Sequence, residues 1–313
     1  MMTATHPKIL CVGMICVDEL LYCKSYPIED SDQRILDRQQ RTGGNAANSC
    51  AVLAELKVKC DLLGTLSSNS RYTSFVKEDL GSYGLSCDLC ELIEGQELPI
   101  STCIINAENG TRTILHYRKD WPEASYEAFL KIDLSQYSWI HFEGRNIDEV
   151  KKMIKRIVEW NNEHAEGYGI TISIEVEKKR DNLLELIPLG DLVIISKDFA
   201  RLQGFNTMSQ AVDGLFGLLK HGATLVVPWG EDGAAAKGPE GFFLVPACPP
   251  ERVLDTLGAG DTFCAALLSA LSGGRPLQRS LRYACEVAGA KVGMHGYRGL
   301  RDVLRERRIT VDH

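Results

Sequence analysis

Residues 255–263 have the sequence Asp-Thr-Leu-Gly-Ala-Gly-Asp-Thr-Phe, and they run directly into the small and apolar residues 264–268. The two glycines let backbone N–H groups converge on one point with no Cβ in the way. The apolar residues that follow predict a helix, whose first N–H groups are unpaired and carry the positive end of the helix dipole. Together these features predict a site for an anion, most naturally a phosphate.

Asp261 falls in the first turn of this predicted helix, where we expect the positive field to keep its carboxylate ionised. A site for an anion alone does not need a carboxylate, whereas a site that also removes a proton from an incoming hydroxyl does. The alternative is that Asp255 or Asp261 only caps the helix, as short acidic residues often do. The segment alone leaves both interpretations open.

Length and composition limit the number of domains, the kinds of partner and the cellular location that we expect for this chain. The 313 residues, 44% of them hydrophobic, suffice for one large α/β domain or two modest ones. The net charge of -7 argues against nucleic acid as the main partner. No apolar run reaches the length of a membrane span and no signal segment is visible, so we expect no membrane partner. The 11 cysteines are scattered, many of them in apolar runs, which favours reduced thiols and a cytoplasmic location.

Strand-like and helix-like segments alternate along most of the chain, which predicts an α/β fold with a mostly parallel sheet covered on both faces. Residues 8–17 are expected to form the first buried strand, which would end at Asp18, where open α/β sheets bind ligands. A solvated loop aspartate is the alternative. Residues 223–228 should form the last parallel strand, and residues 275–294 one long final helix.

Two common nucleotide-binding folds are excluded by the glycine patterns. The chain has no Gly-x-x-x-x-Gly-Lys-Ser/Thr loop of the kind that surrounds phosphates in one class. The Gly258-x-Gly260 element lacks the third glycine of a dinucleotide fingerprint and lies far from the first strand.

Residues 20–41 interrupt the alternation with short, polar, extended segments. A small sheet here would have one face that a ligand or another subunit must cover. Farther along, Asn109-Gly110 separates the apolar runs 100–106 and 113–117 and predicts a hairpin. Arg112 directly follows that turn, either as a solvated charge or as a guanidinium that reaches a phosphate.

Two further glycine segments carry candidate binding residues. Residues 42–48, Thr-Gly-Gly-Asn-Ala-Ala-Asn, precede a predicted helix at 49–56. Asn45 and Asn48 are three residues apart and so share a helix face, and their amides both donate and accept, which suits sugar hydroxyls. Asn45 as a simple N-cap is the alternative. Residues 229–233, Trp-Gly-Glu-Asp-Gly, are either only a loop or a surface for a purine or its ribose.

The Gly-Gly-Asn motif at residues 43–45 and the Asp-Thr-Leu-Gly-Ala-Gly-Asp motif at 255–261 resemble the two signatures of the ribokinase-like (PfkB) carbohydrate kinases. The resemblance implies a ribokinase-like fold, with residues 1–313 as one kinase domain. It also implies a small β-sheet lid at residues 19–42, to which parts of 98–118 are a candidate addition. Strings at 9–13, 104–106, 111–115, 139–146, 175–178 and 196–198 are similar to the ketohexokinase group of this family. The likeness spans roughly residues 9–300 and leaves the basic tail 301–313 outside it.

The resemblance implies ATP-dependent phosphorylation of fructose at its C1 hydroxyl, with Asp261 as the catalytic base. The implied substrate-binding residues are Asp18, Gly44, Asn45, Asn48 and Asp261. The implied ATP-binding residues are Arg112, Gly230, Glu231, Asp232, Gly233, Gly258, Ala259, Gly260 and Asp261.

Cofactors and partners also follow from the resemblance. ATP would be accompanied by Mg²⁺. Its ligands are not assigned, because Ser196-Lys197-Asp198 stands where many members of the family have an Asn-x-x-Glu motif. Whether K⁺ is also required is left open. The lid would pair with that of a second copy to form a homodimer, and Asp30 would reach into the partner's sugar pocket.

Two alternatives to this function remain. The first is another kinase of the family, such as a ribokinase, an adenosine kinase or a fructokinase that acts at C6. The second is a sugar- or nucleotide-binding regulator without catalysis. The intact Asp261, Gly258 and Gly260 speak against a regulator, because binding alone does not need the base.

Overall fold

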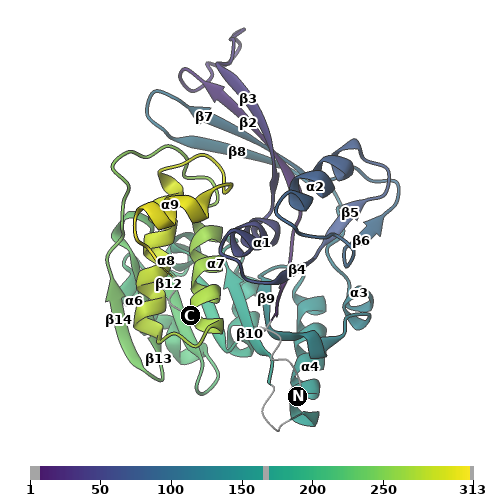
Figure 1. The fold of residues 1–313 in the computed structure, drawn as a ribbon, viewed down its shortest axis with the longest axis vertical. Helices are drawn as coiled ribbons and strands as arrows, with labels where there is room; N and C mark the ends of the chain where they lie inside the picture. The colour runs from purple at the N-terminus through teal and green to yellow at the C-terminus, as the bar shows by residue number, and fades with distance from the viewer. Residues whose placement is uncertain (1–7, 165–168, 311–313) are drawn as a thin grey trace.

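The computed structural model describes residues 8–164 and 169–310, and its body consists of a sheet between two layers of helices (Figure 1). The main sheet has the strand order β14-β13-β12-β11-β10-β9-β1-β4. The six strands β4, β1, β9, β10, β11 and β12 pair in parallel, each with the next in this order. Strand β13 pairs antiparallel with β12 and with β14. The predicted mostly parallel sheet is therefore confirmed. The eight strands are β1 (Lys8–Val12), β4 (Cys60–Leu63), β9 (Tyr137–Glu143), β10 (Thr171–Val176), β11 (Leu192–Ile195), β12 (Thr224–Pro228), β13 (Ala234–Gly238) and β14 (Gly241–Val245).

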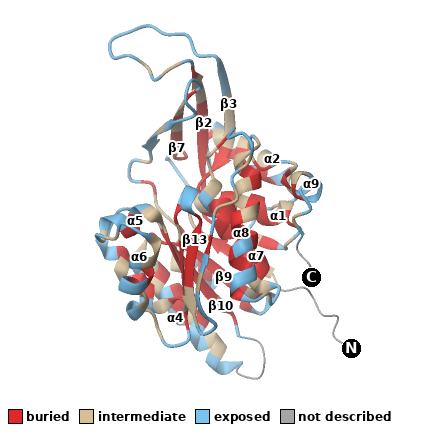
Figure 2. Ribbon diagram, turned by 90° about the vertical axis from the view of Figure 1, so that its left-hand side faces the viewer, coloured by how far each residue is buried: buried red, intermediate tan, exposed pale blue. Residues whose placement is uncertain are grey.

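Helices cover both faces of this sheet (Figure 2). One face packs against α1 (Asn45–Glu55), α2 (Arg71–Gly81), α7 (Ala259–Ser272), α8 (Leu277–Val292) and α9 (Leu300–Glu306). The other packs against α3 (Tyr126–Leu130), α4 (Ile147–Glu163), α5 (Lys197–Leu202) and α6 (Met208–Leu215). Short 3₁₀ helices lie at Leu134–Gln136, Asp181–Leu189, Phe216–Leu218 and Gly230–Asp232.

The apolar strand sequences follow from this two-sided burial. In β1, Ile9 and Cys11 enter the core on the α7 side, and Leu10 and Val12 enter the core on the α4 side. Successive side chains of a strand point to opposite faces, so a strand covered twice must be apolar throughout. The carboxyl ends of the parallel strands then meet at one edge of the sheet, where ligands bind in such folds.

A second sheet of four strands, in the order β3-β2-β7-β8, stands at one end of the body (Figure 1). Its strands are β2 (Cys16–Cys23), β3 (Asp37–Gly43), β7 (Ile100–Asn106) and β8 (Arg112–Tyr117). Strands β7 and β8 pair antiparallel around Asn109-Gly110, which confirms the predicted hairpin. A two-stranded sheet joins β5 (Thr65–Ser67) to β6 (Glu91–Ile93). We refer to the four-stranded sheet as the small sheet.

The structure corrects the prediction for residues 8–17. They form two strands instead of one, because β1 ends at Val12 and β2 begins at Cys16 in the small sheet. Asp18 therefore lies inside β2, between Arg41 of β3 and Ser101 of β7 in the strand register, and not at the end of the first parallel strand. Gly13 to Ile15 carry the chain from one sheet to the other, with Met14 and Ile15 buried.

The helices predicted near the two glycine motifs exist with shifted boundaries. The one expected at 49–56 begins at Asn45, and its N-cap is Gly44 with a φ of 96°, so the alternative that Asn45 is the cap is wrong. The helix expected at 275–294 is α8, but it is not the final helix as predicted, because α9 follows it. Residues 311–313 of the tail lie outside the described part. None of the helices within 8–164 and 169–310 is both long and apolar enough to cross a membrane.

Candidate active site

A cavity of about 620 Å³ lies at the carboxyl edge of the main sheet, between it and the small sheet. Polar side chains reach it from the ends of the parallel strands, among them Arg145, Glu175 and Ser196. Asp18 and Arg112 reach it from the small sheet. The remaining wall is the start of α7, so segments far apart in the sequence meet at the position that the fold class predicts for a ligand.

The segment before and at the start of α7, residues 255–260, is called the anion loop below. Gly258 is the N-cap of α7 with a φ of 72°. A Cβ at Gly258 would lie 1.7 Å from Oη of Tyr297, so no larger residue fits without movement of the loop. Among the described residues, the N–H groups of Gly258, Gly260 and Asp261 have no acceptor. These free donors lie beside the cavity, at the place where the sequence predicts an anion site.

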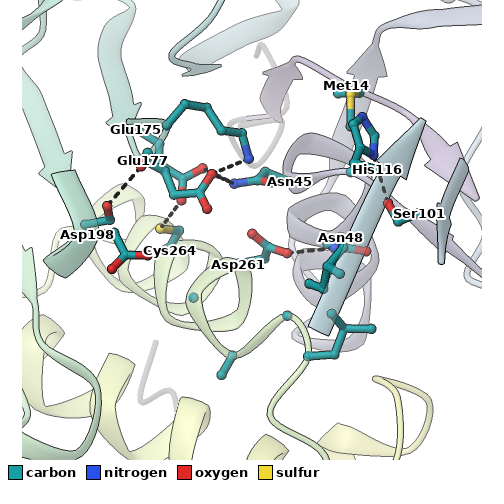
Figure 3. Close-up of a pocket in the computed structure, with 18 of the residues that line it drawn as sticks. Met14, Asn45, Asn48, Ser101, His116, Glu175, Glu177, Asp198, Asp261 and Cys264 are labelled. Carbon is teal, nitrogen blue, oxygen red and sulfur yellow. Dashed lines mark hydrogen bonds and ion pairs between the residues drawn. The ribbon is translucent and has the colours of Figure 1, made fainter. Parts of the chain in front are cut away.

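Asp261 lies in the first turn of α7 and is buried, with its carboxylate at the cavity (Figure 3). Its Oδ2 accepts a hydrogen bond of 2.7 Å from Nδ2 of Asn48. Burial raises the pKa of Asp261 above 3.8; Asn48 lowers it and nearby Glu177 raises it further. Desolvation of this buried carboxylate therefore acts against the ionising effect that the sequence predicts from the helix field.

Asn45 lies on α1, as Asn48 does, but its side chain faces other carboxylates. Its Nδ2 donates to Oε2 of Glu175 at 3.1 Å and to Oε2 of Glu177 at 3.3 Å (Figure 3). Burial and the charge of Asp261 raise the pKa of Glu175. Glu175 and Glu177 were not among the predicted site residues, although their place at the end of an apolar strand is the signal that finds them.

Asp18 lies at the small-sheet side of the cavity and is buried. Its Oδ1 accepts from Sγ of Cys16 at 3.5 Å, and burial raises the pKa of its carboxyl group. A hydrogen bond of 3.0 Å joins Oγ of neighbouring Ser101 to Nδ1 of His116 (Figure 3). These polar groups from β2, β7 and β8 complete a hydrophilic pocket with Asn48 and Asp261.

Gly44 also lines the cavity, and its role in the backbone is visible. With φ at 96°, a Cβ would lie 2.2 Å from the carbonyl oxygen of Met14. Glycine at this position lets α1 begin directly against the segment that connects the two sheets. The predicted substrate-binding residues Asp18, Gly44, Asn45, Asn48 and Asp261 all line this one cavity.

A second cavity of about 450 Å³ adjoins the first and shares Arg112, Thr256 and Gly260 with it. Its other walls are largely apolar, from Ala247, Cys248, Pro249, Pro250, Val253, Phe263, Cys285, Ala288 and Val292. Of the predicted ATP-binding residues, Arg112, Gly230, Ala259 and Gly260 line both cavities. Gly258 and Asp261 line the first, and Glu231 and Gly233 line the second. Asp232 lines neither.

Arg112 and Asp255 each bind other side chains or backbone groups of the protein. Nη1 of Arg112 donates to Oγ1 of Thr256 and so joins β8 to the anion loop. Asp255 does not cap α7: its Oδ1 accepts from the N–H of Leu257 at 2.9 Å, and its Oδ2 pairs with Arg41 and Lys291. The carboxylate of Asp255 therefore binds groups of the protein itself, and Asp255 does not line the first cavity.

Cationic side chains in the first cavity were not predicted. Arg145, Lys178, Arg180 and Lys197 all line it. Nη2 of Arg145 donates to Oε1 of Glu143 at 2.7 Å, and Nζ of Lys197 donates to Oε1 of Glu231 at 2.8 Å. These cations and Arg112 line the cavity together with the carboxylates of Asp18, Glu175, Glu177, Asp198 and Asp261. Lysine and arginine side chains at such a position suit a polyphosphate.

No three His, Cys, Asp or Glu side chains of residues 8–164 and 169–310 form a group that could hold a metal ion by themselves. Mg²⁺ does not require such a group, since it usually keeps several waters and binds one or two carboxylates together with substrate phosphates. Glu175 and Glu177, at the cavity, could supply those carboxylates. The donor set therefore fits Mg²⁺ that arrives with a nucleotide.

Comparison with known proteins agrees with this geometry. Residues 6–302 match the model of the pfkB family of carbohydrate kinases. The chain is 42% identical to ketohexokinase from Mus musculus over 294 residues, which covers 94% of this chain and 98% of the mouse protein. It is 37% identical to ribokinase from Bacillus subtilis over 262 residues, or 82% of this chain and 83% of that protein.

Solved structures show the same fold. The ribokinase of Arabidopsis thaliana complexed with ribose and ATP superposes with a TM-score of 0.77 at 22% identity, covering 96% of this chain and 98% of that one. Ribokinase from Giardia lamblia gives a TM-score of 0.79 at 16% identity, with 96% and 98% covered. The ribokinase-like α/β fold is thus confirmed, and the chain belongs to the pfkB family of carbohydrate kinases and is an ATP-dependent sugar kinase.

Proposed function

We propose that this kinase transfers the γ-phosphoryl group of ATP to the C1 hydroxyl of D-fructose, with Asp261 as the general base. The observation that carries the proposal is the buried Asp261 carboxylate beside the free N–H groups of the anion loop. Similarity to mouse ketohexokinase at 42% identity over nearly the whole chain supports a ketohexose as the acceptor. The same base and donors would serve any sugar hydroxyl that reaches them.

In the proposed reaction the sugar lies among Asp18, Asn45 and Asn48, with its acceptor hydroxyl against Asp261. Asp261 accepts the hydroxyl proton while the oxygen bonds to the γ-phosphorus and the bond to the β-phosphate oxygen breaks. Charge that develops on the phosphoryl oxygens is stabilised by the N–H groups of Gly258 and Gly260 and by Arg112. Positioning and electrostatics then supply most of the rate, since phosphoryl transfer needs little covalent participation by the protein.

Glu175 and Glu177 are the residues that would hold Mg²⁺, which when bound neutralises charge on the β- and γ-phosphates. The second cavity would receive the base of the nucleotide, because its apolar walls provide a surface for a flat ring. Glu231 and Gly233 lie along this cavity, and Asp232 stays a prediction without a contact that supports it.

The product identifies the substrate and the position of transfer. We expect the enzyme, incubated with ATP and fructose, ribose or adenosine in parallel, to phosphorylate fructose fastest. Phosphorus–proton correlated NMR of the product should place the phosphate on C1. Fructose 6-phosphate, or a clear preference for ribose or adenosine, would contradict the proposal and support another kinase of the family, for which the 37% identity to Bacillus ribokinase is the existing support.

The raised pKa of Asp261 predicts how activity depends on pH. Only the deprotonated carboxylate accepts a proton, so kcat/KM should fall as the pH drops through this raised pKa. The amide of Asn48 lowers that pKa, so Asn48→Leu should move the acidic limb upward by about one pH unit and also raise KM. Profiles of kcat/KM from pH 5 to 9, taken with a coupled assay, measure both effects.

Asn206→Leu, at an exposed position on the surface, is the matched control and should leave the limb in place. An acidic limb at the same pH in wild type and Asn48→Leu would show that a group other than Asp261 controls it.

The small sheet is the proposed dimer contact. Its strand β8 carries exposed Ile114, Leu115 and Tyr117, and the connection between β2 and β3 exposes Ile28, Ile35 and Leu36. A second copy would cover these apolar groups, and Asp30, which is exposed, would reach the partner's sugar pocket. The small sheet, including β7 and β8, would thereby act as the lid. A cytoplasmic location is proposed from the cysteines, all of which are free.

A further inference from the structure

Lys291 is the most unusual charged side chain outside the proposed chemistry. It lies on α8 and none of its side chain is accessible to solvent. Lysine is almost never fully buried unless its charge is paired, because removal of an ammonium group from water is costly. The contacts of Lys291 therefore require an explanation, and its hydrogen bonds and its ion pair all lead to the anion loop.

The ammonium group of Lys291 is surrounded by oxygen atoms of Asp255 and Leu257. Nζ donates to the carbonyl oxygen of Asp255 at 2.9 Å and to the carbonyl oxygen of Leu257, and lies 3.2 Å from Oδ2 of Asp255. The ring of Tyr297 lies on another side, 5.5 Å from Nζ. The cation is thus bound by the backbone of the loop itself.

Peptide geometry connects this cation to the cavity. In a trans peptide the C=O and the following N–H point in opposite directions. An ammonium on the carbonyl oxygens of Asp255 and Leu257 therefore turns the N–H groups of Thr256 and Gly258 away from Lys291. Both residues line the first cavity, and neither N–H has an acceptor among the residues that the structure describes.

The charges around Asp255 also favour an anion at the loop. Its carboxylate pairs with Lys291 and also with Nη1 of Arg41 at 2.6 Å. Burial alone would raise the pKa of Asp255, but Lys291, the N–H of Gly296 and Arg41 lower it to about 2. Burial lowers the pKa of Lys291 to about 8, so at neutral pH it is mostly protonated. Two cations share one carboxylate next to the anion loop, and the surplus positive charge favours a bound anion.

We propose that Lys291 is a positioning residue for recognition of the terminal phosphates: its ammonium holds the peptides 255–256 and 257–258 so that their N–H groups face the phosphoryl group. Lys291 does not touch the nucleotide and acts only through the loop. The proposal rests on the proposed function in one respect, namely that the cavity receives the terminal phosphates of ATP.

Nucleotide binding separates this role from simple packing. Lys291→Met keeps an unbranched side chain, one atom shorter than that of lysine, and removes the charge. Its affinity for AMP-PNP should fall by about tenfold or more, whereas its affinity for AMP, which lacks the terminal phosphates, should stay within about threefold. In turnover, kcat should fall on the order of 100-fold with the KM for the sugar nearly unchanged. Calorimetric titrations and a coupled assay give these values.

Leu281→Ala is the matched control, because Leu281 is also fully buried on α8 and lines neither cavity. It should lower the melting temperature and affect AMP and AMP-PNP equally. If Lys291→Met fails to fold, Lys291→Gln replaces it, since an amide can still donate to both carbonyl groups; its AMP-PNP affinity should fall in the same direction.

Equal loss of affinity for AMP and AMP-PNP in the Lys291 variants, as in Leu281→Ala, would show that Lys291 only supports packing and would overturn the proposal. The comparison of nucleotides needs no sugar. A wild-type enzyme that phosphorylates none of the tested sugars would therefore refute the proposed function and leave this test intact.

Discussion

Asp261→Asn is expected to lower kcat by three orders of magnitude or more, on the order of what removal of a positioned general base costs. The amide is close in size to the carboxylate and can still accept from Asn48 through its oxygen, so the local packing should persist. It cannot take up the hydroxyl proton. Binding of ATP should stay near normal, because the N–H donors of the anion loop and Arg112 are unchanged. Coupled ADP release and calorimetry with AMP-PNP measure the two effects.

The control is Asp302→Asn, which makes the same chemical change at a side chain that is 75% exposed on α9. It should retain wild-type kcat. Near-wild-type turnover by Asp261→Asn would remove the assignment of the base, whereas weakened AMP-PNP binding with low kcat would mean that the carboxylate also shapes the anion loop.

The anion loop could be predicted because its signals are local. Glycines that permit the left-handed N-cap and the apolar residues of α7 lie within one short segment, and the structure places the helix start at Ala259 with Gly258 at a φ of 72°. The same holds for the hairpin at Asn109-Gly110. Patterns of this kind depend on backbone geometry and on neighbours in the sequence, and both are visible without the fold.

Asp18 could not be placed from its neighbours. Residues 9–12 and 14–18 are all buried, in the main sheet, in the connection and in the small sheet alike, so hydrophobicity gives no sign of the break between β1 and β2. Strand β13, which lies between β12 and β14, was missed for the opposite reason. It is Ala-Ala-Ala-Lys-Gly, with residues that rarely favour strands, and its pairing with β12 and β14 determines its structure.

The other features that could not be predicted depend on contacts between residues far apart in the sequence. Lys291 is separated from Leu257 by 34 positions, and Asn45 is separated from Glu175 by 130. No local pattern indicates that a lysine in the last turn of a helix binds carbonyl groups of a loop, and a solvated position is the usual expectation for that residue. The rise in the pKa of Asp261 on burial was likewise not predictable, because desolvation depends on the folded surroundings.

Gly258→Ala should reduce kcat by about 100- to 1000-fold, comparable to loss of an oxyanion-hole donor. The added Cβ would meet Oη of Tyr297 at 1.7 Å, and φ at 72° is unfavourable for alanine. The loop must shift to relieve both, which moves the N–H groups that are proposed to bind the phosphoryl oxygens. Because the proposed sugar contacts, Asp18, Asn45 and Asn48, lie outside the loop, the KM for the sugar should change little. Steady-state kinetics, with circular dichroism to confirm folding, test this prediction.

Gly274→Ala separates the collision from the backbone effect. Gly274 has a comparable φ of 79°, but a Cβ there would meet no atom within 4 Å, and it does not line the first cavity. It should cost some stability and leave kcat unchanged. Removal of the colliding atom by Tyr297→Phe in the Gly258→Ala background should restore part of the lost kcat. Equal kinetics for Gly258→Ala and Gly274→Ala would mean that the position of the Gly258 N–H does not govern phosphoryl transfer, and the anion loop would lose its assigned role.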